Sequence, residues 1–192
     1  MLKNKVNRET WLREAYALLR RELLPEAPET VAIAWSFPSS KAASRTRPTI
    51  GQCWQGGGIS GKIEGGKAIL ISPALHDPLA ILHVLLHEMI HAALPPGVGH
   101  GAKFSQTCKR VGLVKPWTAT TPSPELKAKL QAMLAKLPGW PEGSLVIRPK
   151  ETGRQLKGEC SCGRILRGSK KLFTDGPVIC GLCNAEFEME ES

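Results

Sequence analysis

The sequence predicts an α+β fold, in which a small antiparallel three-stranded sheet packs against helices and a zinc ribbon follows at the C-terminal end. Three observations support this prediction. Helix and strand patterns do not alternate, because one helix comes first, three strands follow and the other helices come after them. Histidines gather in the second helix and just beyond it, and four cysteines gather near the end of the chain. Both groups have the composition of metal sites.

Apolar spacing and the positions of Pro and Gly locate the individual elements. Leu12, Ala15 and Leu19 recur at helical spacing, which predicts an amphipathic first helix. A Gly-rich turn at 56–66 predicts a hairpin between two strands, and Pro38 ends the strand before them. The expected helices span 8–24, 78–94, 102–112 and 123–137, and the expected strands span 30–37, 50–55 and 67–72.

Length and composition fit one domain of ordinary size with a small appendage. The chain has 192 residues, of which 42% are hydrophobic and 22% are charged, as in soluble globular proteins. We expect a catalytic domain over 1–115, a helical connector over 116–143 and a four-cysteine ribbon over 144–192. No apolar run reaches the length of a membrane span, and the first residues lack a signal-peptide core. We therefore expect a cytosolic protein with no membrane partner.

The formal net charge of +9 indicates a polyanionic partner, most often nucleic acid. Between positions 148 and 171, eight Lys and Arg stand against two Glu, a local net charge of +6. Phe173, inside the ribbon, could stack on a base or fill the ribbon's small core, and both interpretations stay open. We expect DNA with single-stranded character as the partner. The residues expected to contact it are Arg164, Arg167, Lys170 and Lys171.

All five histidines of the chain fall within 25 consecutive positions, where a transition metal would give several imidazoles one common partner. His87 and His91 share one helix face, so both rings can reach one ion. A Pro/Gly break allows His100 to return as the third ligand, with Phe104 packing the next helix down. His83 lies about 12 Å of helix rise before His91. We therefore expect His83 to support a ligand or to pack, not to bind the ion.

Three histidine ligands leave the fourth position of a zinc ion open to water, which is typical of a catalytic site. Glu88 stands beside His87 and is expected to take a proton from the zinc-bound water, whose hydroxide then attacks a polarised carbonyl. That chemistry hydrolyses a peptide bond without a covalent intermediate. The alternative is a buried helix, or a zinc that only stabilises the fold.

Four cysteines form two close pairs, Cys160 with Cys162 and Cys180 with Cys183, separated by 17 residues. This spacing is typical of a zinc ribbon with four thiolate ligands, although the first pair is one residue shorter than the usual knuckle. Metal would supply the stability that so short a segment lacks. We expect a second, structural zinc here, and the alternative is a redox dithiol.

The segments "LLHEMIHAAL" and "GHGAKF" closely resemble the SprT-like metalloprotease family, which includes the Spartan proteases. An N-terminal helix, a three-strand region and a Gly-rich hairpin that ends in "AILISPAL" agree with this resemblance. A four-cysteine ribbon is similar to that of the bacterial members. The resemblance covers residues from about 8 to 187.

The resemblance implies a zinc metalloendopeptidase that acts on proteins near or crosslinked to DNA, with DNA binding switching on or directing cleavage. It implies His87, His91 and His100 as zinc ligands and Glu88 as the catalytic glutamate. The strand at 67–72 is expected as the sheet edge beside the cleft, where an extended substrate could add. The absence of long regulatory tails fits a bacterial or phage origin and a nucleoid-associated place in the cytoplasm.

Two competing functions remain open at this point. One is a non-catalytic DNA-binding or transcription-linked factor, in which the histidine site only stabilises the fold. The other is a zinc hydrolase with a non-protein substrate.

Overall fold

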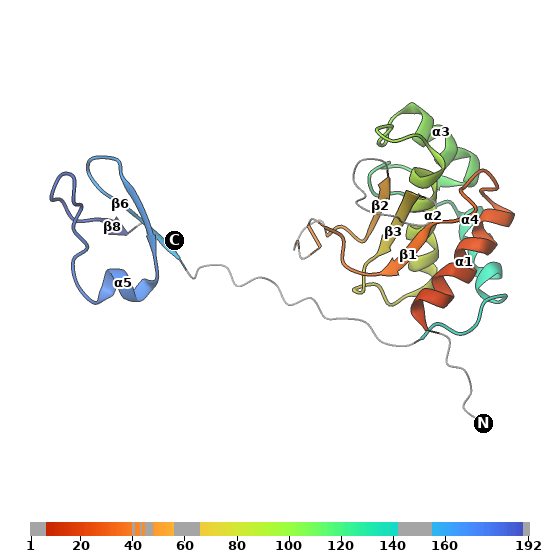
Figure 1. Ribbon diagram of the computed structural model, residues 1–192, viewed down its shortest axis with the longest axis horizontal. Helices are drawn as coiled ribbons and strands as arrows, with labels where there is room; N and C mark the ends of the chain where they lie inside the picture. Colours follow the sequence, from red (N-terminus) through yellow and green to blue (C-terminus); the bar gives the residue numbers. More distant parts are fainter. Residues whose placement is uncertain are drawn as a thin grey trace, which may run out of the picture. The chain divides into compact units, whose positions relative to one another are not determined.

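The computed structural model describes residues 7–39, 41, 42, 44, 48–55, 66–141 and 155–189. The chain forms two compact units, Met1–Arg148 and Pro149–Ser192 (Figure 1). The elements of the first unit are α1 (Arg8–Glu22), β1 (Ala32–Trp35), β2 (Gly51–Gln55), β3 (Lys67–Ile71), α2 (Pro78–Ala93), α3 (Ala102–Val111), β4 (Leu113–Val114), β5 (Thr121–Pro122) and α4 (Pro124–Leu134). Those of the second unit are β6 (Leu156–Glu159), β7 (Ile165–Gly168), α5 (Lys170–Thr174) and β8 (Glu188–Met189).

The main sheet has the strand order β1-β3-β2, so that β3 is its central strand. β2 and β3 run antiparallel, with Cys53 opposite Ile69, whereas β1 runs parallel to β3, with Ile33 opposite Ile69. The prediction of an antiparallel sheet is therefore wrong for one of the two ladders. After β1 the chain crosses to the far edge of the sheet and forms β2. It then returns and forms β3 between β1 and β2, which is the kind of crossover that the parallel pair β1 and β3 requires. Most of the predicted Gly-rich turn, 56–65, lies outside the described residues.

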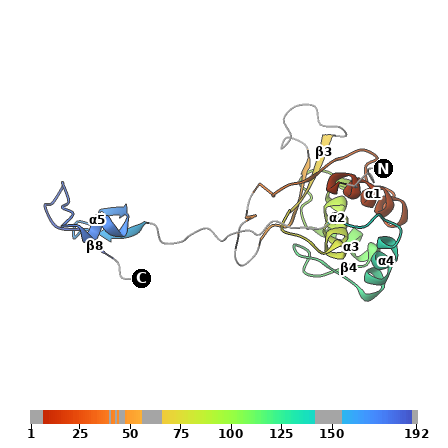
Figure 2. The same cartoon turned by 90° about the horizontal axis from the view of Figure 1, so that it is seen from below.

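α2 is the central element of the first unit, and its limits follow from its capping residues. The Asp77 side chain accepts hydrogen bonds from the backbone of Leu79 and Ala80, both at 3.1 Å. Pro78 occupies the first turn, where its missing N–H costs nothing. α2 packs against β2, β3, α1, α3 and α4, and Figure 2 shows α1, α3 and α4 around it. Most of its apolar residues are therefore buried. A polar side chain in the middle of this helix is consequently surrounded by protein.

α1 covers β1 and part of α2 with the apolar face that its spacing predicts. Asn7 caps the helix by accepting a hydrogen bond of 2.7 Å from the Thr10 backbone. Trp11 is buried on this face, and its indole Nε1 donates a 2.8 Å hydrogen bond to the Pro138 carbonyl. The ring of Trp140 lies edge-on to Trp11, at 4.8 Å between centroids. The chain after α4 therefore returns to pack against α1.

The segment expected as a connector, 116–143, is part of the first unit for all of its described residues, 116–141. α4 packs on α2 and buries Leu126, Leu130 and Met133 in the same core that holds the first helix. β4 and β5 form a short antiparallel ladder that reverses the chain before α4 begins. The described part of the chain contains no helix that is long and apolar enough to cross a membrane.

The second unit is built on a three-stranded sheet with the order β7-β6-β8. Phe173 of α5 packs directly on β6, because a Cβ placed on Gly158 would lie 2.5 Å from the Phe173 ring. This contact favours the interpretation of Phe173 as part of the small core of the ribbon.

Replacing Leu130 with Ala should lower the free energy of unfolding by about 2–5 kcal/mol, because it opens a cavity between α4 and α2. Lys127→Ala, on the exposed face of the same helix, should change it by no more than about 0.5 kcal/mol. Urea unfolding at fixed zinc concentration, followed by tryptophan fluorescence, measures both. If the two changes altered the free energy of unfolding equally, α4 would be a connector that does not share the core of the first unit.

Candidate metal centre

α2 and the loop after it bring three imidazoles together. His87 and His91 lie one turn apart on α2, and His100 follows a loop that begins with two prolines. Gly97 and Gly99 in that loop have positive φ angles of 83° and 55°, which glycine adopts without strain. The loop can therefore reverse within a few residues and set His100 over α2.

The Nε2 atoms of the three rings converge. His100 Nε2 lies 3.2 Å from His91 Nε2 and 3.4 Å from His87 Nε2. A tetrahedral zinc with Zn–N bonds of about 2.0–2.1 Å holds neighbouring nitrogens about 3.3–3.4 Å apart. The three rings therefore have the donor type and the spacing that one zinc ion needs, and the group could hold a metal ion.

Phe104, the first buried residue of α3, holds the three rings in place. It is fully buried, and its ring lies 5.0 Å from that of His87, 4.3 Å from that of His91 and 4.9 Å from that of His100, between centroids. The ring of His91 stacks on it at 25°. The expectation that Phe104 packs the second helix down is confirmed.

His87 is buried, His91 is half-buried and His100 is exposed, and the pKa of each is lowered. Burial and, to a smaller extent, the neighbouring imidazoles lower the pKa of His87 to about 3. Burial, followed by the proximity of His100, lowers the pKa of His91 to about 4, and burial also lowers the pKa of His100. A neutral imidazole has a free lone pair, so all three are in the form that binds metal near neutral pH.

Thr120 orients the first ligand. Its hydroxyl Oγ1 lies 2.9 Å from Nδ1 of His87, the ring nitrogen that faces away from the other histidines. When Nε2 has a lone pair for a metal, Nδ1 carries the proton and donates a hydrogen bond to this hydroxyl. His83 lies outside the group of three and contacts the same hydroxyl at 3.4 Å through Nε2. Thr120 is thus a common partner of His83 and His87.

Sequence reasoning missed Thr120, and no pattern in the chain indicates it. It lies 33 residues after His87 and reaches the site only because the β4–β5 ladder turns the chain back. The side chain is 3% exposed, so its hydroxyl has little access to water.

Glu88 is buried beside His87, with 6% of its surface exposed. Burial raises the pKa of its carboxyl to about 8, and a hydrogen bond with the Cys53 backbone opposes this shift. β2 passes very close to it, since a Cβ added to Gly51 would lie 2.6 Å from Oε1 of Glu88 and 2.6 Å from Cγ1 of Val84. Only glycine allows the strand and the helix to approach this closely.

A cavity of about 530 Å³ opens beside His87 and Glu88. Its walls come from residues 48–51, from α2 and from residues 118–120. Gly51 belongs to β2, which is the edge strand of the sheet on this side, whereas β3 is central. The expected edge at 67–72 is therefore wrong, because β3 has a partner on each side and offers no free backbone groups for a further strand.

The second unit brings the four ribbon cysteines together. Sγ of Cys160 lies 3.1 Å from that of Cys183, and Sγ of Cys162 lies 3.5 Å from that of Cys160 and 3.7 Å from that of Cys180. Zinc–thiolate bonds of about 2.3 Å place tetrahedral sulfurs about 3.8 Å apart, so this group also has suitable donors at nearly suitable spacing. The four could hold a metal ion.

Each cysteine pair lies on a turn that ends in a left-handed residue. Gly163, directly after Cys162, has φ 81°, and Asn184, directly after Cys183, has φ 58°. The Gly163 backbone donates to the Cys160 carbonyl at 2.7 Å, and the Asn184 backbone donates to the Cys180 carbonyl at 2.9 Å. The two turns are alike, so the shorter first pair still presents both of its sulfurs to the centre.

The four cations expected to contact DNA are all exposed on the second unit. The Arg164 guanidinium lies 4.0 Å from Sγ of Cys180, and Lys171 forms a 3.9 Å ion pair with Asp175 on α5. Arg167 lies on β7 and Lys170 begins α5. The four cations thus lie on more than one element of the second unit, and Arg164 lies beside the cysteine group.

Replacing Thr120 with Val keeps the shape of the side chain and removes the hydroxyl that holds His87. We expect the affinity of the histidine group for zinc to fall by about 10–100-fold. Thr118→Val, at an exposed position of the same cavity, serves as the control and should change little. Competition with a chelator measures the affinity of each group for zinc. Cobalt in place of zinc distinguishes the two groups, because cobalt bound to imidazoles and cobalt bound to thiolates have different absorption spectra. An unchanged affinity would contradict the role of Thr120.

The comparison with protein families agrees with this geometry. The model of the SprT-like family matches residues 12–127, which is more than half of the chain. The match runs from α1 into α4 and includes all three histidines of the metal group. No curated relative matches the chain. The chain belongs to the SprT-like family.

Proposed function

We propose that the protein is a zinc-dependent endopeptidase that cleaves proteins bound or crosslinked to DNA. The observation that carries the proposal is the convergence of three imidazoles next to a buried glutamate, with His87 and Glu88 lining a cavity of about 530 Å³. A site that only stabilises the fold would need neither the cavity nor the carboxylate.

His87, His91 and His100 would hold the ion through their Nε2 atoms. Zinc, when bound, supplies a Lewis acid that polarises a carbonyl and makes water more acidic. Thr120 keeps the His87 ring in the tautomer and orientation that ligation needs. Phe104 contacts all three rings and would keep them in place around the ion.

Glu88 would act first as the general base and then as the general acid. Its carboxyl lines the cavity beside His87. The positive charge of a bound zinc would favour the ionised carboxylate against the effect of burial. The carboxylate would then accept a proton from the attacking water and later return it to the departing amine. The closeness of Gly51 limits the directions in which the carboxylate can turn. Burial thus serves to position the base as well as to alter its pKa.

The substrate would lie along β2. This strand is the free edge of the sheet next to the cavity, so an extended peptide can pair with its backbone and pass Glu88. Backbone pairing recognises the extended shape of a peptide and little of its sequence. A protease of this design would cut varied proteins in unfolded or flexible segments.

Exposed cations on the second unit support action near DNA. Arg164, Arg167, Lys170 and Lys171 would contact phosphates and bring the protease to proteins on the nucleic acid. A zinc held by the four cysteines would stabilise the unit that carries them.

Glu88→Gln should abolish proteolysis and leave zinc binding intact, because the amide keeps the shape of the side chain but cannot accept the proton. We expect a loss of about 100-fold or more in the rate of casein digestion, with unchanged zinc content. Glu14→Gln, an exposed change on α1, should digest casein like the unchanged protein. If Glu88→Gln still cuts, the mechanism is wrong. If the unchanged protein never cuts but binds DNA, the non-catalytic factor is the better description.

Replacing the four ribbon cations with Gln should weaken binding to single-stranded DNA and flatten its dependence on salt. Each lost phosphate contact should reduce the salt slope by about 0.7. Fluorescence anisotropy with a labelled oligonucleotide measures both quantities. The control replaces four exposed cations of the first unit, namely Arg13, Lys103, Lys127 and Lys136, so that net charge falls equally. An equal loss of DNA affinity in the two variants would mean that net charge alone, and not the surface of the ribbon, accounts for the effect.

A further inference from the structure

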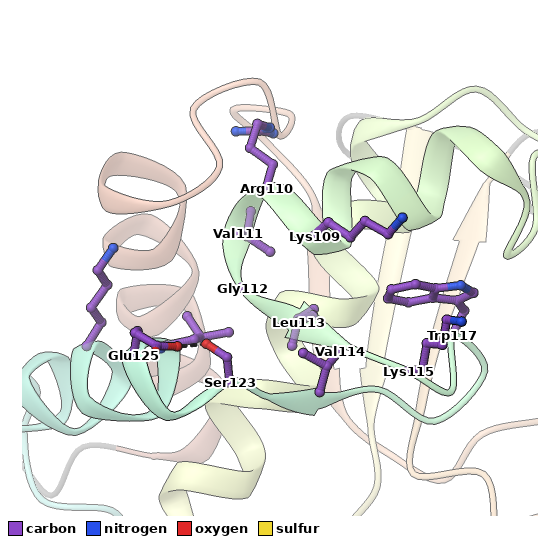
Figure 3. A pocket seen from close by; sticks show the side chains of 12 residues that line it. Lys109, Arg110, Val111, Gly112, Leu113, Val114, Lys115, Trp117, Ser123 and Glu125 are labelled. Atoms are coloured by element: carbon purple, nitrogen blue, oxygen red, sulfur yellow. Dashed lines mark hydrogen bonds between the residues drawn. The ribbon is translucent and has the colours of Figure 1, made fainter.

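A second hollow in the first unit, which we call the basic groove, lies between the end of α3 and the start of α4. Its volume is about 510 Å³ (Figure 3). β4 and the loop after it form its floor and one side. Its lining includes Lys109, Val114, Lys115, Trp117 and Lys129. None of the three metal-group histidines belongs to it.

The groove has an excess of positive charge. Four cations line it, and Glu125 is the acidic residue of the lining. Arg110 points away from Trp117 and forms an ion pair with Glu26, so its charge is already compensated (Figure 3). No ion pair appears for the three lysines among the described residues. They are Lys109, Lys115 and Lys129.

Helix electrostatics explain only part of this charge. Lys109 lies in the last turn of α3, where a cation also complements the helix dipole. Lys115 lies in the loop after β4, and Lys129 lies in the middle of α4, so the dipole does not account for them. Cations from three separate elements thus face one hollow.

Trp117 adds a flat aromatic surface to these cations. It is half-buried and packs against the core, which fixes the position of its ring. The Lys109 ammonium lies 6.0 Å from the ring centroid, and Figure 3 shows the side chain extending from α3 toward the indole. Val114, 43% exposed, adds an apolar contact on the floor. The groove therefore offers cations and a stacking surface side by side.

The loop from 115 to 120 separates the groove from the catalytic cavity. Its first part, with Lys115 and Trp117, lines the groove, whereas residues 118–120 line the cavity beside His87. Thr120, at the end of the same loop, holds His87 through its hydroxyl. A ligand in the groove would lie next to the cleft and in contact with the loop that positions a metal ligand.

We propose that the basic groove binds a single strand of nucleic acid, with phosphates on the three lysines and a base stacked on Trp117. Single strands expose both backbone charge and base faces, and these two features match the two features of the groove. An acidic peptide would match the lysines and leave the indole without a planar partner. This inference rests on the proposed action near DNA, and it adds a contact on the protease unit itself, apart from the ribbon.

The test uses full-length, zinc-loaded protein and a fluorescent oligothymidylate. The groove variant is Lys109→Gln with Lys129→Gln, and the matched control is Lys103→Gln with Lys127→Gln. Each pair removes one lysine from α3 and one from α4, but the control positions lie outside the groove. We expect the groove variant to bind about fivefold more weakly or worse, with a salt slope lower by about 1.4. The control should differ from the unchanged protein by less than a third of that loss.

A second variant examines stacking. Trp117→Leu keeps an apolar side chain against the core and removes the aromatic face. We expect binding about five- to a hundredfold weaker, with a salt slope that does not change, because no charge is lost. Thermal melting of the variant checks that the fold persists. Tryptophan quenching by the oligonucleotide should also be smaller than in the unchanged protein.

The outcomes separate this inference from the proposed function. Equal affinity of the groove variant and its control would overturn the groove, and so would failure of the unchanged protein to bind the oligonucleotide. A third result would also overturn the proposal. Polyglutamate would displace the oligonucleotide from the control variant, and Trp117→Leu would bind the oligonucleotide as tightly as the unchanged protein. These two observations together would identify an acidic peptide as the occupant of the groove. Casein digestion that depends on Glu88 would survive all these results, since it does not require nucleic acid in the groove.

Discussion

The burial of polar side chains in the middle of α2 is the constraint on which the rest of the first unit depends. His87 and Glu88 sit on a helix that packs on every side, so each needs a partner inside the protein. A metal ion shared with two further imidazoles would supply that partner for His87, and Phe104 closes the site from the side of α3. The sheet, the loop to His100 and the β4–β5 ladder are therefore all arranged around this helix.

The two metal groups are built in different ways. The histidine group depends on contacts between distant parts of a large core, and Thr120 reaches it from beyond α3. The cysteine group depends on two similar turns, each closed by a hydrogen bond within a few residues. The second unit buries few apolar side chains, so metal would contribute much of its stability. A metal in the cysteine group would be structural, whereas His87 of the histidine group lines a cavity.

The loop from 115 to 120 connects the basic groove with the cavity beside His87. One half of the loop lines the basic groove and the other half lines the cavity beside His87 and Glu88. An occupant that shifts Trp117 would act on a short, continuous stretch that ends at the His87 hydrogen bond. Such a link would allow nucleic acid to influence cleavage from within the protease unit, without any fixed arrangement of the ribbon.

Local patterns in the sequence determined the helices and the chemistry of the sites. The capping residue Asp77, the helical spacing of His87 and His91, and the paired cysteines all act over a few residues, and the structure has helices within three residues of the expected ends. Tertiary structure alone decided which strand became central, that β1 runs parallel to β3, and that Thr120 holds His87. Strand order and such contacts depend on packing between distant segments, and a periodic pattern carries no information about which distant segments meet.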